Sequence, residues 1–236
     1  MPITKFRNPL TAGAALVLTL CAALAALAVV PGQGASPSIK ISIDHNTNES
    51  ATHAFKFQRV ASPTNDNAAR RAKLAIIDGE ADPNSGGLAA LNDGILPTEE
   101  DDPDANFFFD ADTPGGRFTM DFGNAIEIAA VNTYSWHPNT RGPQVYRLYA
   151  SDGAAANFNP APKAKVDPAT VGWKLIATIN TDPGIGETGG QYGVSITDSS
   201  GGLGKFRYLL FSCFATETDD PYGNTFYSEI VVLEKK

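Results

Sequence analysis

Residues 117–122 read Arg-Phe-Thr-Met-Asp-Phe, a strict alternation of polar and apolar side chains. Successive side chains of an extended strand point to opposite faces, so Phe118, Met120 and Phe122 share one face. Residues 39–43, Ile-Lys-Ile-Ser-Ile, repeat the pattern. Strands of this kind are buried on one side only, which predicts a sheet whose apolar face has to be covered by a second layer.

Short runs rich in aromatic and β-branched residues continue this pattern along the chain, and Gly, Pro, Asn and Asp separate them. The run at 209–211 is apolar on both faces, which predicts a central strand. The remaining strand candidates are residues 54–60, 73–77, 106–109, 126–135, 144–151, 173–180, 206–214 and 226–233.

The segments between these runs are predicted to be loops, above all 79–87, 152–172 and 182–191. A short helix is predicted only at 68–75, where Asn65 or Asp66 could cap its first turn. We therefore expect an all-β fold, an antiparallel β-sandwich of the jelly-roll type with at most one short helix. We see no break in composition that would divide residues 36–236 into two domains.

The N-terminus has the layout of a secretory signal peptide. Lys5 and Arg7 precede an uncharged apolar run at 13–30, and small residues follow up to Ala35. Cleavage near Ala35 predicts a secreted or cell-surface protein. The run is nearly long enough to cross a bilayer, so the alternative is an uncleaved anchor, which would be the chain's membrane contact.

The charge balance argues against nucleic acid as a partner. The chain has 26 acidic and 18 Lys and Arg residues, a net charge of −8, and loss of the leader would remove two more basic residues. An acidic surface repels phosphate backbones. Removal of Cys21 with the leader would leave Cys213 without an internal partner, and its apolar neighbours predict a buried, unreactive thiol.

Several segments, taken in order, resemble the discoidin or coagulation-factor C-terminal type family of galactose-binding-like domains. The resemblance spans roughly residues 73–232. The animal members' cysteine pair is missing and the insert before Trp173 is long, which puts their membrane-lipid role in doubt. The segments that carry the resemblance are Leu-Asn-Asp-Gly at 91–94, 116–123 ending Asp-Phe-Gly, the strand 126–134, Tyr-Arg-Leu-Tyr-Ala-Ser-Asp-Gly at 146–153 followed by Gly-Trp at 172–173, Phe-Arg-Tyr-Leu at 206–209 and Tyr-Ser-Glu-Ile at 227–230.

The resemblance implies a structural Ca²⁺. In sugar-binding relatives an Asp of the Asp-Gly loop and the Glu of the last strand hold the ion, and here Asp93 and Glu229 stand in those places. The carbonyl groups of Leu91 and Asn92 could add oxygen ligands of the kind that calcium takes. The alternative is that Asp93 only forms a turn and that Glu229 is an exposed strand residue.

A ligand site is predicted in the turn at 134–143. Trp136 could stack on the C–H face of a sugar, while His137, Asn139 and Arg141 could bond its hydroxyl groups. The resemblance places Arg141 where an Arg of sugar-binding relatives contacts the ligand. Tyr222, in a neighbouring loop, could supply a second ring. Alternatively, Trp136 points into the core, and His137 and Arg141 only hold the turn together.

Two motif matches do not indicate a nucleotide cofactor. Residues 184–189 fit a dinucleotide pattern, but Pro183 precedes them and no helix start follows. Residues 201–205 resemble a phosphate loop in part, yet Phe206 stands where a Ser or Thr would bind the metal. With only His45, His53 and His137 available, we expect no enzyme, and a hydrolase centred on His137 is the third hypothesis.

The sequence thus predicts a secreted, noncatalytic module that binds an extracellular glycan through loops at one end of the sandwich. The alternative is a structural or adhesion protein that binds another protein at the cell surface.

Overall fold

The computed structural model describes residues 38–184, 186, 188–217 and 222–236, so the predicted signal peptide at 1–35 lies outside the described residues. No helix in this described part is long and apolar enough to cross a membrane. Its strands all pair antiparallel, and they are β1 (Ile39–Thr47), β2 (Lys73–Asp78), β3 (Gly115–His137), β4 (Val145–Ser151), β5 (Lys174–Asn180), β6 (Gly190–Asp198), β7 (Gly204–Phe214) and β8 (Tyr227–Glu234).

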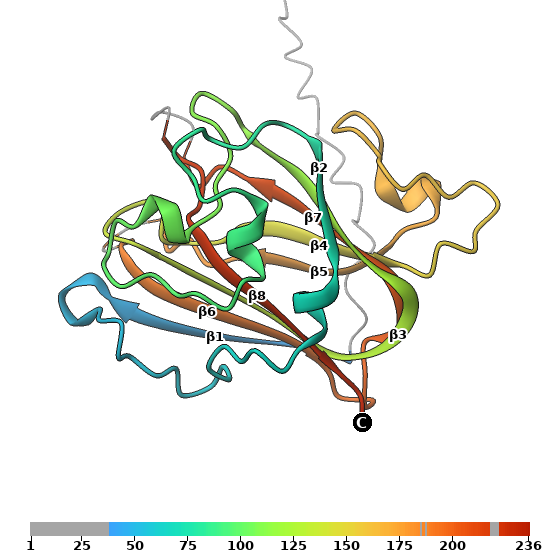
Figure 1. Cartoon of the computed structure of the whole chain (residues 1–236), viewed down its shortest axis with the longest axis horizontal. Coiled ribbons are helices and arrows are strands. Elements are labelled where there is room, and N and C mark those ends of the chain that lie inside the picture. The colour runs from blue at the N-terminus through green and yellow to red at the C-terminus, as the bar shows by residue number, and fades with distance from the viewer. Residues whose placement is uncertain (1–37, 185, 187, 218–221) are drawn as a thin grey trace, which may run out of the picture. The chain divides into compact units, whose positions relative to one another are not determined.

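The long strand β3 belongs to two layers. Its first half pairs with β2 and β7, and β7 continues through β4 to β5. Its second half pairs with β6 and β8, and β6 pairs with β1. The register shift between Asp121 and Ile126 marks the place where β3 passes from one layer to the other. Figure 1 shows β1 beside β6 in one layer and β4 beside β5 in the other.

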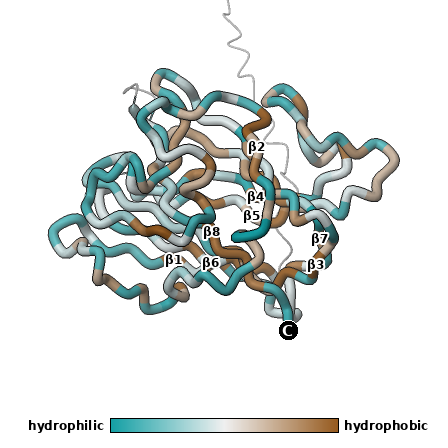
Figure 2. The backbone as a smooth tube through the Cα atoms, viewed as in Figure 1, coloured by the Kyte–Doolittle hydropathy of each residue, from teal (hydrophilic) through white to brown (hydrophobic). Residues whose placement is uncertain are grey.

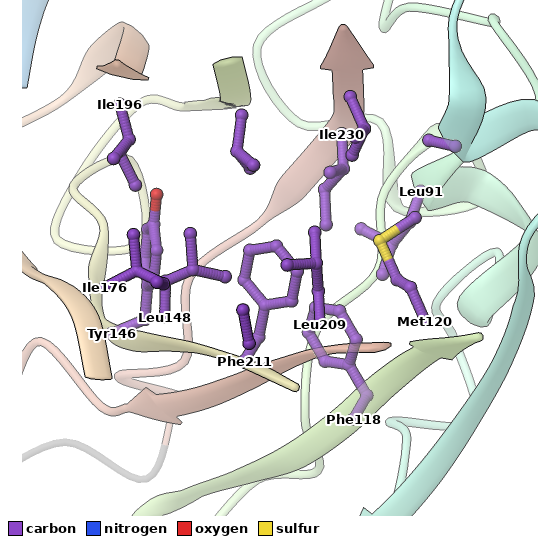
Figure 3. Close-up of a cluster of buried hydrophobic side chains, with 14 of the residues drawn as sticks. Leu91, Phe118, Met120, Tyr146, Leu148, Ile176, Ile196, Leu209, Phe211 and Ile230 are labelled. Carbon is purple, nitrogen blue, oxygen red and sulfur yellow. The ribbon is translucent and has the colours of Figure 1, made fainter. Parts of the chain in front are cut away.

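One hydrophobic core fills the space between the layers. Phe118 of β3 and Phe211 of β7 stack with their ring centroids 4.9 Å apart. Figure 3 shows these rings with Leu209 and Met120, facing Ile196 and Ile230 of the other layer. Burial of each such side chain contributes about 1.5–3 kcal/mol. In Figure 2 the brown, hydrophobic stretches include parts of β2, β3 and β8. The eight antiparallel strands confirm the predicted all-β antiparallel sandwich.

Cys213 is buried in this core, as its apolar surroundings predict. Burial raises the pKa of its thiol to about 12, which keeps it protonated and unreactive at neutral pH.

The predicted helix at 68–75 is wrong. A single 3₁₀ turn ends at Arg71 because Ala72 is already extended and Lys73 starts β2. The helical residues of the described part are one-turn 3₁₀ helices, namely η1 (Asn48–Ser50), η2 (Ala68–Arg71), η3 (Leu88–Leu91), η4 (Pro103–Ala105) and η5 (Pro168–Val171).

Two predicted strands are also wrong. Residues 54–60 form a loop that crosses the outer side of the β1-β6-β3-β8 layer, and its rings pack on that layer without joining it. In the segment 106–109, Phe107 and Phe109 each make only an isolated bridge, to Tyr227 and Ala81. Strand β6 was not predicted from the sequence, although Tyr192, Val194 and Ile196 alternate with polar or small residues.

Candidate functional site

The turn that joins β3 to β4 lies at one end of the sandwich, against the segment that leads into β8. Phe226 N donates to the carbonyl oxygen of Arg141 at 2.9 Å, and Thr225 Oγ1 donates to that of Pro143 at 2.6 Å. Thr216 Oγ1, just after β7, donates to the carbonyl oxygen of Thr140. These hydrogen bonds join three chain segments into one fixed surface.

Arg141 is held over aromatic rings. Its guanidinium carbon lies 4.0 Å from the ring centroid of Phe226 and 4.6 Å from that of Phe108, and these two rings stack at 4.0 Å. Its Nε donates to the carbonyl oxygen of Asn224 at 3.1 Å. A guanidinium fixed in this way loses little further conformational freedom when it bonds a ligand.

His137, the last residue of β3, lies beside Arg141 and is only 5% exposed. Its ring meets the edge of Phe226 at 4.5 Å. Nδ1 accepts from Asn139 N at 3.3 Å, so Nε2 carries the proton in the neutral ring and faces Asp101 Oδ1 at 3.8 Å. Burial, followed by the charge of Arg141, lowers the pKa of His137 to about 4. His137 is therefore neutral at physiological pH.

Tyr222 supplies an exposed ring next to these groups. It is 56% exposed, and its ring centroid lies 6.0 Å from the guanidinium carbon of Arg141. Asn139 is also exposed. The structure thus brings together four of the five predicted ligand-binding residues, and we call His137, Asn139, Arg141 and Tyr222 the loop-end cluster.

The fifth residue, Trp136, is not part of this cluster. Consecutive strand residues point to opposite faces, so Trp136 faces away from its neighbour His137. Trp136 lines a pocket on the outer side of the β1-β6-β3-β8 layer, together with Phe55 and Phe57. Its side chain is only 5% exposed.

The predicted metal ligands also lie close together. Glu229 Oε2 accepts from Gly94 N at 2.8 Å, and the negative charge of Asp93 acts on the same carboxyl group. Glu229 Oε1 is buried and has no hydrogen-bond partner among the described residues. Burial, with a further contribution from Asp93, raises the pKa of Glu229 to about 8.

A cation from the protein itself is already present at this place. Arg70 Nη1 donates to the carbonyl oxygen of Asn92 at 2.9 Å, which is one of the predicted calcium ligands. Leu91 is fully buried. Asp93 Oδ1 accepts from Ile95 N at 2.7 Å. Within the described residues, no group of three or more His, Cys, Asp or Glu side chains is arranged to hold a metal ion.

Phe108 and Phe226, which support Arg141, were not singled out in the sequence. Phe226 was assigned to a strand, and Phe108 stands in an aromatic run, Phe-Phe-Phe at 107–109. In an extended segment, Phe108 points to the opposite face from Phe107 and Phe109, whose side chains enter the core. That was the available signal, but it gives no indication that Arg141 is the partner.

No protein-family model matches the chain, and no curated protein matches it. The solved structures similar to it include the family 32 carbohydrate-binding module of NanJ from C. perfringens in complex with galactose, at 11% identity and a TM-score of 0.44, covering 70% of this chain and 96% of that one. The lectin domain of lectinolysin in complex with Lewis B antigen gives 12% identity and a TM-score of 0.45, covering 72% of this chain and 98% of that one.

A third similar structure, SpGH29, is much longer. At 12% identity and a TM-score of 0.43, the match covers 72% of this chain but only 28% of that one. Several of the similar solved structures are carbohydrate-binding modules or lectin domains.

Proposed function

We propose that this protein is a secreted, noncatalytic module that binds an extracellular carbohydrate at the loop-end cluster. The observation that carries the proposal is the fixed guanidinium of Arg141 beside the exposed ring of Tyr222. A sugar presents an apolar C–H face and a set of hydroxyl groups, and this pair offers a ring for the first and planar donors for the second. A glycan is also the ligand class that the sequence resemblance implies.

The other two members of the cluster fit the same ligand. Asn139 is exposed and has an amide that can both donate and accept. His137 is neutral, so a bound sugar would meet a polar ring without a buried positive charge. The leader-like pattern at 1–35 supports the extracellular location in this proposal.

A glycan array followed by affinity electrophoresis on the retained polysaccharides tests the proposal. We expect the wild-type protein to be retained, with affinity about two- to twelvefold lower for Tyr222→Ala, because an aromatic contact contributes about 0.5–1.5 kcal/mol. Arg141→Lys should also weaken binding, because lysine keeps the charge but lacks the planar fork. Lys205→Ala, which removes an exposed charge at the start of β7, is the matched control and should bind like wild type.

If the wild-type protein binds no polysaccharide, the proposal is wrong. Equal losses for Lys205→Ala and Arg141→Lys would show that retention does not depend specifically on the loop-end cluster.

A further inference from the structure

The pocket that Trp136 lines on the outer side of the β1-β6-β3-β8 layer has no part in the loop-end cluster. It encloses about 70 Å³, and we call it the outer-face pocket. The loop at 53–63 forms one wall, and the exposed Leu96 with Pro97 forms another. The residues lining it are His53, Phe55, Lys56, Phe57, Ser62, Pro63, Leu96, Pro97, Tyr134, Ser135, Trp136, Gln191 and Ser228.

The wall formed by the 53–63 loop is fastened at both ends. Gln191 bonds the backbone of Thr52 twice, with Nε2 donating to its carbonyl oxygen at 2.8 Å and Oε1 accepting from its N–H at 3.2 Å. At the other end, Asp44 accepts from Val60 N and from Arg59 Nε, each at 2.8 Å. The loop is therefore held as an arch above the sheet.

A glycine in β6 makes room for the aromatic lining under this arch. A Cβ atom at Gly193 would lie 3.0 Å from the ring of Phe57, so the ring rests directly on the strand backbone. Phe57 also contacts Tyr134, with ring centroids 5.6 Å apart. The aromatic rings are thus placed by the sheet itself, which is what a preformed ligand pocket requires.

One residue that lines the pocket, Trp136, has an unused hydrogen-bond donor. Trp136 is 95% buried, and its Nε1 has no hydrogen-bond partner in the described part of the chain. A buried donor left without an acceptor costs about 1–3 kcal/mol. Because indole Nε1–H can only donate, the group that would relieve this cost must be a hydrogen-bond acceptor, such as an oxygen atom of a ligand.

The charged residues that line the pocket indicate which charge the ligand carries. Lys56 and His53 both line the pocket, whereas none of its lining residues is an Asp or Glu. The chain as a whole has a net charge of −8, so this lining is opposite in character to the average surface. A negatively charged oxygen acceptor would therefore interact favourably with both Lys56 and Trp136.

We propose that the outer-face pocket binds a small organic carboxylate with an apolar, ring-sized body. The body packs against Phe55 and Phe57 under the arch. The carboxylate accepts from Trp136 Nε1 and pairs with Lys56. This site is independent of the loop-end cluster, because Trp136 and His137 point to opposite faces of β3.

Fluorine NMR titration with 4-fluorophenylacetate tests the site, with 4-fluorophenylacetamide as the neutral probe of the same shape. We expect the carboxylate to bind at least fivefold more tightly than the amide. Lys56→Gln should abolish this difference in affinity, and Trp136→Phe should lower the affinity for the carboxylate by a similar factor. The control Lys40→Gln removes an exposed charge of β1 that does not line the pocket and should change nothing.

A second readout covers the case in which Trp136→Phe does not fold. The chain has two tryptophans, so Trp173→Phe leaves Trp136 as the sole indole fluorophore. Its emission should change with the same midpoint as the NMR titration, and Arg141→Lys should leave that midpoint unchanged. No binding at millimolar probe, equal affinity for the amide, or an unchanged Trp136 emission at saturation would overturn the proposal.

Discussion

Trp136 and His137 are consecutive residues of β3, and their side chains lie on opposite faces of the strand. Both are aromatic residues near the same turn, and the sequence suggested that they share one site. The alternation of β3 sends Trp136 under the 53–63 arch and His137 against Phe226. Sequence proximity predicted the region correctly, but the face of each side chain depends on the strand's partners, which a single sequence does not reveal.

The neutral state of His137 has a consequence for stability. The unfolded chain protonates this residue near its ordinary pKa of 6.5, whereas the folded chain does so only near pH 4. Because the folded state binds fewer protons in this range, its stability falls as the pH drops from 6.5 toward 4. The contribution of His137 to this loss reaches about 3 kcal/mol.

Urea unfolding at a series of pH values between 7 and 4 measures this effect. His137→Gln should lose less stability than wild type across the series, because glutamine does not titrate. His53→Gln, a substitution at an exposed histidine, should lose as much as wild type. Parallel curves for His137→Gln and wild type would contradict the buried, neutral state of this residue.

At the scale of elements, alternating polarity predicted the strands that bury one face. Two separate strands were predicted at 117–122 and 126–135; instead the chain continues as one strand, β3, through a register shift into the second layer. The loop at 54–60 has strand-like composition, but the hydrogen bonds from Arg59 and Val60 to Asp44 hold it as an arch. Tertiary contacts of this kind override local propensity.

The loop at 91–97 and strand β8 together form the proposed calcium position. We propose that Ca²⁺ binds between Asp93 and Glu229, a proposal supported by the unpartnered Oε1 of Glu229. Arg70 would then have to release the carbonyl oxygen of Asn92. Replacement of Arg70 by a neutral residue should therefore strengthen the binding of Ca²⁺.

Thermal unfolding with Ca²⁺ and with a chelator tests this position. Ca²⁺ at a hundred times its dissociation constant should stabilise the wild-type protein by about 2.7 kcal/mol and raise its melting temperature. Glu229→Gln should remove the response, Arg70→Gln should enlarge it, and the control Glu99→Gln, which removes an exposed carboxylate outside the proposed position, should leave it intact. Equal melting temperatures with and without Ca²⁺ in the wild-type protein would exclude the ion.

At the scale of the whole molecule, two layers share one core and one strand, β3, that passes between them. Most of the buried apolar side chains of both layers pack in that core, and the connecting segments supply most of the residues that could recognise a ligand. One set of these segments forms the loop-end cluster, and the arch at 53–63 forms the outer-face pocket. The alternation of polar and apolar residues was enough to predict the two layers. That residues 137–141, 222 and 226 come together could be seen only in the folded structure.

Hydrogen exchange with and without a retained polysaccharide tests the central claim most directly, because it maps the ligand onto the chain without any substitution. We predict slower exchange of backbone amides at 137–143 and 222–226 in the complex, with the arch at 53–63 unchanged. Protection confined to any other surface, with these two segments exchanging as in the free protein, would contradict the claim that the loop-end cluster binds the glycan.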